Sequence, residues 1–169
     1  LKINRRLHGR AMKYQVQSIS LSGPIITWEF DNLHDARCKV RKLKDEFGDV
    51  LFWDAHSIRR NVSTIQKEDF PDLILGNNDG ITASSDIIEN ALNSLKDSVL
   101  EVTHNHPFKG GYLTRSKGNP TNQIHALQLE MSKDLYMSNN ELNYDEDKAN
   151  DIKKILVKTF ENLITLMNE

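Results

Sequence analysis

The first residues able to do chemistry follow a short apolar run. Residues 50–56 predict a buried strand that begins Val-Leu-Phe-Trp and ends near Asp54, His56 and Arg59. Because side chains alternate along a strand, Asp54 and His56 are expected on the same face. An imidazole held on a rigid strand beside a carboxylate suits a metal ligand or a general base. A histidine that is only hydrogen-bonded at a strand end explains the pattern equally well.

A second strand is predicted over residues 99–104, followed by a polar, Gly-rich loop over 105–120. Such a loop suits the approach of a small ligand, and its Arg115 could hold a carboxylate through two hydrogen bonds. Arg115 could equally pair with a surface acid. His104 and His106 have the spacing of a metal-binding pair, but no third ligand at a diagnostic spacing accompanies them.

A third strand is predicted over residues 124–131, where side chains alternate and Glu130 stands near the end. A carboxylate in such a strand is costly to bury unless it is paired or used. If the three strand ends converge, His56 could bind zinc, Glu130 could activate the metal-bound water and Arg115 could bind a substrate carboxylate. Zinc lowers the pKa of its bound water to about 7, so hydroxide would form at neutral pH.

Amphipathic periodicity and turn residues predict the elements that would position these groups. Together they place residues 1–169 in one α/β domain. In chain order we expect a strand tail at 1–3, a polar turn at 4–6, a loop at 18–27, a helix at 32–47 with Asp31 or Asn32 as N-cap and Gly48 at its end, a strand at 70–76, a turn at 77–80, a helix from Ser84 or Ser85, and a closing helix from residue 147.

The composition is that of a folded globular chain. It has 169 residues, 38% of them hydrophobic and 27% charged, which is enough for one domain with a core. A net charge of −2 gives no support for nucleic-acid binding. The single Cys38, which we interpret as a small core residue, cannot form an internal disulfide and fits a reducing compartment. No apolar run is long enough to cross a membrane, so a cytoplasmic location without a membrane partner is expected.

Four blocks of the sequence stand in a family-specific order and spacing. They are residues 53–59 (WDAHSIR), 70–76 (FPDLILG), 107–115 (PFKGGYLTR) and 125–131 (HALQLEM), the last with Tyr136 and Met137 behind it. Together they resemble the N-formylglutamate amidohydrolases, from about residue 31 to the end of the chain. The opening Ile3, Asn4 and Arg5 also resemble a family segment in which Asn-Arg ends a strand.

The resemblance implies a three-layer αβα fold with a mixed sheet, similar to zinc carboxypeptidases and aspartoacylases. It implies the hydrolysis of N-formyl-L-glutamate to formate and L-glutamate, late in histidine degradation, with one zinc ion. The expected partner is therefore a small N-acyl amino acid and not a nucleic acid.

The resemblance also implies roles for individual residues. His56 would be a zinc ligand, and Glu130 would be the general acid and base. Asp54 would orient His56 or hold the loop. Glutamate carries two carboxylates, so more than one binding residue is sensible, and the candidates are Arg115, Arg59, Asn4 and Arg5.

The start of the chain departs from the family pattern. The family has an N-terminal part with a histidine and an acidic residue that complete the zinc site. Nothing in residues 1–30 resembles that part, because His8 stands in an expected basic loop and Lys2 falls near an acidic family position. A catalytic zinc site needs about three protein ligands. We therefore expect an N-terminally incomplete domain with an incomplete zinc site.

Two alternatives use the same observations. One is a truncated, catalytically inactive relative that binds an acidic small molecule or a partner. The other is a purely structural or interaction domain, which gives no reason for polar residues to gather at three strand ends. A sheet without its first strands would expose an edge, so a homo-oligomer through that edge is also expected.

Overall fold

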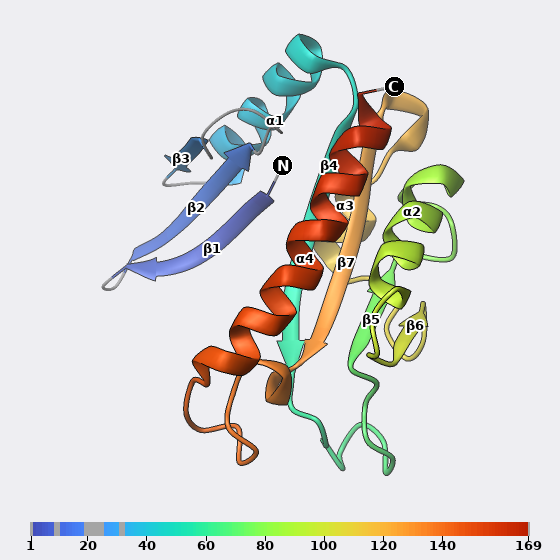
Figure 1. Ribbon diagram of the computed structural model, residues 1–169. Coiled ribbons are helices and arrows are strands. Elements are labelled where there is room, and N and C mark those ends of the chain that lie inside the picture. The colour runs from blue at the N-terminus through green and yellow to red at the C-terminus, as the bar shows by residue number, and fades with distance from the viewer. Residues whose placement is uncertain (1, 9–10, 19–25, 31–32, 169) are drawn as a thin grey trace.

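The computed structural model describes residues 2–8, 11–18, 26–30 and 33–168 (Figure 1). The described strands form two sheets. The first contains β1 (Lys2–His8), β2 (Ala11–Ser18) and β3 (Ile26–Phe30), paired antiparallel in that order. The second has the order β4-β7-β5-β6, with β4 at Val50–Ile58, β7 at Ile124–Ser132, β5 at Leu73–Gly76 and β6 at Val102–His104.

The second sheet is mixed, as predicted. β4 and β7 run parallel along their whole length, so their carboxyl ends meet at one edge of the sheet. β5 is antiparallel to β7 and parallel to β6, so β5 and β6 run in the opposite direction. The expected convergence of three strand ends is therefore wrong for the strand that ends at His104. It is right for the two strands that carry His56 and Glu130.

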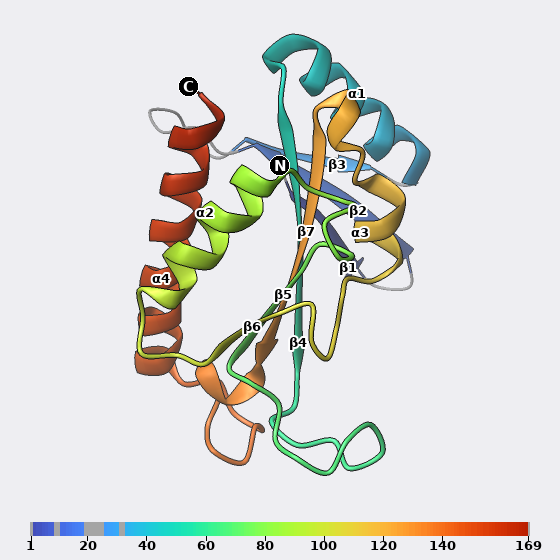
Figure 2. The ribbon, with the colours of Figure 1, turned by 90° about the vertical axis from the view of Figure 1, so that its right-hand side faces the viewer.

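Helices lie on both faces of the mixed sheet (Figure 2). α2 (Ser85–Lys96) and α4 (Glu146–Met167) pack together on one face, and α3 (Tyr112–Lys117) lies against β4 and β7 on the other. α1 (Leu33–Phe47) leads into β4, and two short 3-10 helices, η1 (Pro120–Asn122) and η2 (Lys133–Leu135), flank β7. None of the helices in the described part of the chain is long and apolar enough to span a bilayer.

The apolar core lies between the sheet and the pair α2 and α4. Alternation along β4 and β7 directs one set of side chains into this core, and Trp53 meets Phe160 of α4 edge-on with ring centroids 5.0 Å apart. Full burial of such side chains contributes about 1.5–3 kcal/mol each. The same alternation leaves the polar residues of both strands on the opposite face. The buried core residues of the sheet are Leu51, Trp53, Leu73, Leu75, Leu127 and Leu129, and they pack with Ile87, Ile88, Ala91, Leu95, Ile152 and Leu163.

The ends of the helices follow from local sequence. α1 ends at Gly48, whose φ of +81° is a conformation that glycine adopts without strain. The N-cap of α2 is Ser84, one of the two residues expected there. α4 begins one residue earlier than expected, because the Asp145 side chain accepts a hydrogen bond from the Lys148 N–H at 3.1 Å. The expected N-caps Asp31 and Asn32 lie outside the described residues.

Several expected boundaries are wrong. The strand expected at 70–76 begins only at Leu73, and the loop expected at 18–27 overlaps the end of β2 and the start of β3. The described residues of the expected strand tail and turn form one strand, β1, because strand pairing with β2 overrides the polar composition of that segment. His8, which was expected in a loop, is the last residue of this strand. Asn4 and Arg5 therefore pair with Gln15 and Tyr14 in mid-strand, and their side-chain roles lie outside what the structure describes.

Two further corrections lie around β6. The strand expected at 99–104 begins only at Val102, since the preceding residues form a turn in which Val99 is fully exposed. The loop expected at 105–120 contains α3, a helix too short for amphipathic periodicity to reveal.

Candidate functional site

His56 lies near the carboxyl end of β4, where Asp54 holds its imidazole. The Nε2 atom of His56 is 2.8 Å from Oδ1 of Asp54, which confirms that both lie on one face. Asp54 is buried, whereas 48% of the His56 side chain is exposed. The hydrogen bond to Asp54 raises the pKa of His56, against the opposing effect of burial. With Nε2 engaged by Asp54, Nδ1 is the ring nitrogen through which His56 could bind a ligand.

Glu130 of β7 stands opposite His56 in the parallel register. Neighbouring strands lie about 4.8 Å apart, and the two residues share the face that carries Asp54. Burial raises the pKa of Glu130, and the charge of His56 opposes that rise. A carboxyl group whose pKa is raised can hold a proton closer to neutral pH, as a general acid must.

Thr114 of α3 joins this group from the far side of Asp54. Its Oγ1 donates a hydrogen bond to Oδ2 of Asp54 at 3.1 Å, and both residues are buried. Asp54 therefore binds His56 with one carboxylate oxygen and Thr114 with the other. Two such hydrogen bonds offset the cost of burying the carboxylate.

Gln128 provides a second link between α3 and the sheet. Its Oε1 accepts a hydrogen bond from the Gly111 N–H, and its Nε2 donates to Oε2 of Glu130 at 3.4 Å. Sequence reasoning missed both Gln128 and Thr114. Gln128 could have been found as a polar residue on the Glu130 face of an apolar strand, whereas nothing in the sequence beyond its neighbour Arg115 marks Thr114.

Arg115 reaches this side of the sheet on α3 and not on a loop. The helix packs against both β4 and β7, and Arg115 is exposed on it. Its Nη1 donates to the carbonyl oxygen of Gly110, whose φ is +120°. Arg115 is thus a near neighbour in sequence of Thr114 and Gly111, the two residues that contact β4 and β7.

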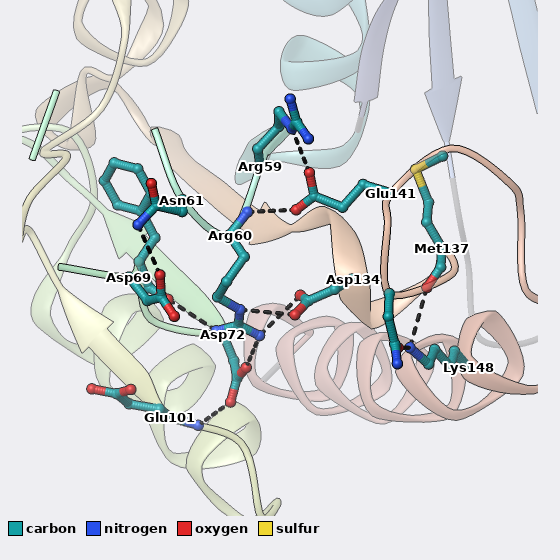
Figure 3. A network of polar contacts seen from close by, with 12 residues as sticks. Arg59, Arg60, Asn61, Asp69, Asp72, Glu101, Asp134, Met137, Glu141 and Lys148 are labelled. Atoms are coloured by element: carbon teal, nitrogen blue, oxygen red, sulfur yellow. Dashed lines mark hydrogen bonds and ion pairs between the residues drawn. The ribbon is translucent and has the colours of Figure 1, made fainter. Parts of the chain in front are cut away.

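Arg59 and Arg60 follow β4 directly and bind carboxylates from later segments (Figure 3). Glu141 accepts from Nε of Arg59 and from the backbone N–H of Arg60, both at 2.6 Å. The Arg60 guanidinium donates to both oxygens of Asp134 at 2.9 Å and to Asp72 at 2.5 Å. The Arg59 side chain is 64% exposed. Because Glu141 already binds its guanidinium, a substrate carboxylate at Arg59 would compete with that ion pair.

His104 belongs to a different polar cluster, at the end of β6. Its Nε2 lies 3.0 Å from Oδ1 of Asn77, which also accepts from Nδ2 of Asn105 at 2.8 Å. Burial lowers the pKa of His104, as expected for a neutral, hydrogen-bonded ring. The backbone carbonyl of His106 accepts a hydrogen bond from Thr103. These contacts describe a structural role for His104 and do not support a metal pair.

The donors around His56 do not complete a zinc site. Catalytic zinc takes about three protein ligands, and within the described ranges no group of at least three His, Cys, Asp or Glu side chains is arranged to hold a metal ion. The carboxylate beside His56, that of Asp54, is already bound to His56 and Thr114. A zinc ion at His56 would therefore need ligands from beyond the described residues.

Comparison with known proteins gives a family match and two curated relatives. Residues 32–137 match the N-formylglutamate amidohydrolase family. An N-formylglutamate deformylase of Pseudomonas putida is 35% identical over 131 residues, which are 76% of this chain and 49% of that protein. The N-formylglutamate deformylase of Pseudomonas aeruginosa is 33% identical over 129 residues, or 75% of this chain and 48% of that protein. The chain thus spans about half the length of the curated relatives it matches.

Two solved structures share the fold. The crystal structure of N-formylglutamate amidohydrolase from Ralstonia eutropha JMP134 superimposes with a TM-score of 0.65 at 24% identity, over 80% of this chain and 50% of that one. A gene product of Agrobacterium tumefaciens superimposes with a TM-score of 0.59 at 14% identity, again over 80% of this chain and 50% of the other. The segment matched by the family covers more than half of the chain and includes His56, Arg115 and Glu130. This chain belongs to the N-formylglutamate amidohydrolase family.

Proposed function

We propose that this protein hydrolyses an N-acyl amino acid, with N-formyl-L-glutamate as the leading substrate. The observation that carries the proposal is the placement of Glu130 opposite His56, on the face of the sheet that Arg115 approaches on α3. The name of the Pseudomonas relatives, N-formylglutamate deformylase, supports the choice of substrate. The helices on both faces of a mixed sheet support the wider αβα architecture of zinc carboxypeptidases.

Glu130 is the group that would move protons in this reaction. Water adds to the formyl carbon and the C–N bond breaks, which yields formate and the free amine. Glu130 would take a proton from the attacking water and pass it to the leaving nitrogen. Its raised pKa favours holding the proton between these steps. Asp54 would keep the His56 ring in one orientation.

Arg115 would bind a carboxylate of the substrate. A guanidinium group matches a carboxylate with two parallel hydrogen bonds, which fixes both position and orientation. Release of L-glutamate would place the reaction late in histidine degradation, as the resemblance implies. Zinc, which the family resemblance also implies, would need ligands besides His56.

The proposal is tested by formate release from N-formyl-L-glutamate by the purified protein in zinc-containing buffer. We expect turnover by the wild type and a rise in KM of about tenfold or more for Arg115→Met, since a charge-assisted contact contributes about 1.5–3 kcal/mol. Lys117→Met, a neighbouring basic residue on α3, is the matched control and should keep the wild-type KM. Absence of formate release by the wild type would refute the proposal.

A second candidate function is the binding of an acidic small molecule without hydrolysis. The absence of a three-ligand metal group among the described residues favours it. It predicts that L-glutamate binds to the wild type and not to Arg115→Met in calorimetry, while no formate is released by either. Binding and turnover measured on one preparation therefore separate the two candidates.

A further inference from the structure

Two of the polar contacts that join α3 and its N-cap residue Gly111 to the sheet end on residues of the candidate site. Thr114 Oγ1 donates to Asp54, which holds His56. The Gly111 N–H donates to Gln128, which in turn donates to Glu130. The helix that carries Arg115 is thus joined separately to the histidine and to the glutamate of the pair.

These contacts have little freedom to shift. Thr114 is fully buried, Gln128 is 6% exposed and Asp54 is 5% exposed, and hydrogen bonds between buried polar groups are costly to break. A Cβ at Gly111 would lie 3.0 Å from Oε1 of Gln128, and a Cβ at Gly110 would lie 3.0 Å from the Thr114 methyl group. A side chain at either glycine would therefore require Gln128 or Thr114 to shift by a few tenths of an ångström.

Residues 109–111, which precede α3, also contact the sheet at Gly76 and the turn that follows it. The Lys109 carbonyl accepts from the Asn78 N–H at 2.7 Å, and a Cβ at Gly76 would lie 2.6 Å from the Lys109 carbonyl carbon. Residues 109–111 are therefore fixed against β5 on one side and against Gln128 on the other. Thr114 and Gln128 set where α3 sits relative to β4 and β7.

We propose that Thr114 and Gln128 are positioning residues, which hold the Arg115 helix at a fixed separation from the His56–Glu130 pair. This inference rests on the proposed function for its catalytic consequence. A substrate bound through its carboxylate at Arg115 presents its acyl carbon to Glu130 only if that separation is kept. A displacement of about 1 Å at a reacting centre can lower a rate about a hundredfold.

Thr114→Val tests the first contact, because valine keeps the volume and removes the hydroxyl donor. We expect kcat to fall about tenfold or more while KM changes less than about threefold, since binding at Arg115 survives and alignment does not. Thr114→Ser keeps the donor and should restore kcat to within about threefold of wild type. The matched control is Thr159→Val, another fully buried threonine, whose hydroxyl bonds Ile155 within α4 on the opposite face.

Each kinetic outcome either supports or overturns the inference. The inference is supported if kcat falls in Thr114→Val, is restored in Thr114→Ser and is unchanged in Thr159→Val. Equal kcat in Thr114→Val and wild type overturns it. An equal loss in Thr114→Val and Thr159→Val also overturns it, because it would reflect a general weakening of the fold.

Amide hydrogen exchange tests the same contacts without turnover. The Gly111 N–H is bound to Gln128, and the Gly118 N–H is bound to the Thr114 carbonyl at the end of α3. We expect both amides to be protected in the wild type, with faster exchange at Gly111 in Gln128→Leu and at Gly118 in Thr114→Val. Unprotected amides in the wild type would overturn the inference, whereas protected amides in a protein that releases no formate would refute only the proposed function.

Discussion

His125 shows how one buried side chain ties stability to pH. It is 5% exposed, and its Nδ1 accepts a hydrogen bond from the Ser84 N–H at 3.2 Å, at the start of α2. Only a neutral imidazole has a free nitrogen that can accept this bond. Burial lowers the pKa of His125 below its usual 6.5. The unfolded chain therefore binds a proton more readily than the folded one, and the stability from this group is lost as pH falls below 6.5 towards the lowered folded-state pKa.

The expected result is a smaller pH dependence of stability in His125→Asn. Asparagine keeps an acceptor oxygen near the position of Nδ1 and does not titrate. The free energy of unfolding, from urea denaturation at about pH 7.5 and about pH 5.5, should decrease less in the variant than in the wild type. Identical decreases in the two proteins would show that His125 does not carry the effect.

At the residue scale the sequence predicts contacts between near neighbours and not those between distant segments. Alternation along one strand was enough to place Asp54 beside His56. The contact between Asp54 and Thr114 joins positions 60 residues apart, and no local pattern encodes it. Gln128 is an intermediate case, because its face could be predicted and its partner Gly111 could not.

At the scale of elements, Arg60 fastens three segments together at the carboxyl end of β4. Its guanidinium binds Asp72 before β5 and Asp134 in η2, and donates to the Phe70 carbonyl at 2.9 Å. Burial alone would lower the pKa of Arg60, but the hydrogen bonds to Asp134 and Asp72 raise it above its usual range. The same contacts lower the pKa of Asp134 against the effect of burial.

Replacement of Arg60 is therefore expected to destabilise the fold. Arg60→Met should lower the free energy of unfolding by about 1–3 kcal/mol, since it leaves two partly buried carboxylates without their cation. Lys154→Met is the control, because the ion pair of Lys154 with Asp151 is 76% exposed on both sides and should be worth too little to detect. Urea denaturation measures the free energy of unfolding of both variants. Equal stability of Arg60→Met and wild type would contradict the structural role of the cluster.

Elements with strong periodicity were predictable, and short or hairpin-dependent ones were not. β4, β7, α2 and α4 appear close to where apolar spacing predicts them, because each buries one continuous face. β1 depends on pairing with β2, and α3 depends on contacts with the sheet. Neither kind of support is visible in a local window of sequence. The direction of β6, and so the separation of His104 from the site, also required the topology.

At the scale of the whole molecule, the strand order leaves β4 at one edge of the mixed sheet. β4 is a nine-residue strand that is hydrogen-bonded to β7, and β1 of the first sheet also contacts it. A long edge strand is a ready site for pairing with a second chain. We expect a dimer or larger assembly in sedimentation equilibrium. A single monomeric species across the concentration range would contradict this prediction.

The two faces of the mixed sheet carry different kinds of side chain. The face under α2 and α4 holds the apolar core, and the opposite face holds Asp54, His56, Gln128 and Glu130. Substitutions at these polar positions leave the apolar cluster under α2 and α4 unchanged. This division allows the central claim to be tested with single, nearly isosteric substitutions.

The most direct test is the rate of formate release by Glu130→Gln beside the wild type. Glutamine keeps the size of Glu130 and cannot transfer its proton, so we expect kcat to fall by a factor of about 10²–10⁴. Glu161→Gln, an exposed glutamate on α4, should retain the wild-type rate. Equal rates for Glu130→Gln and the wild type would contradict the assignment of Glu130 as the general acid and base.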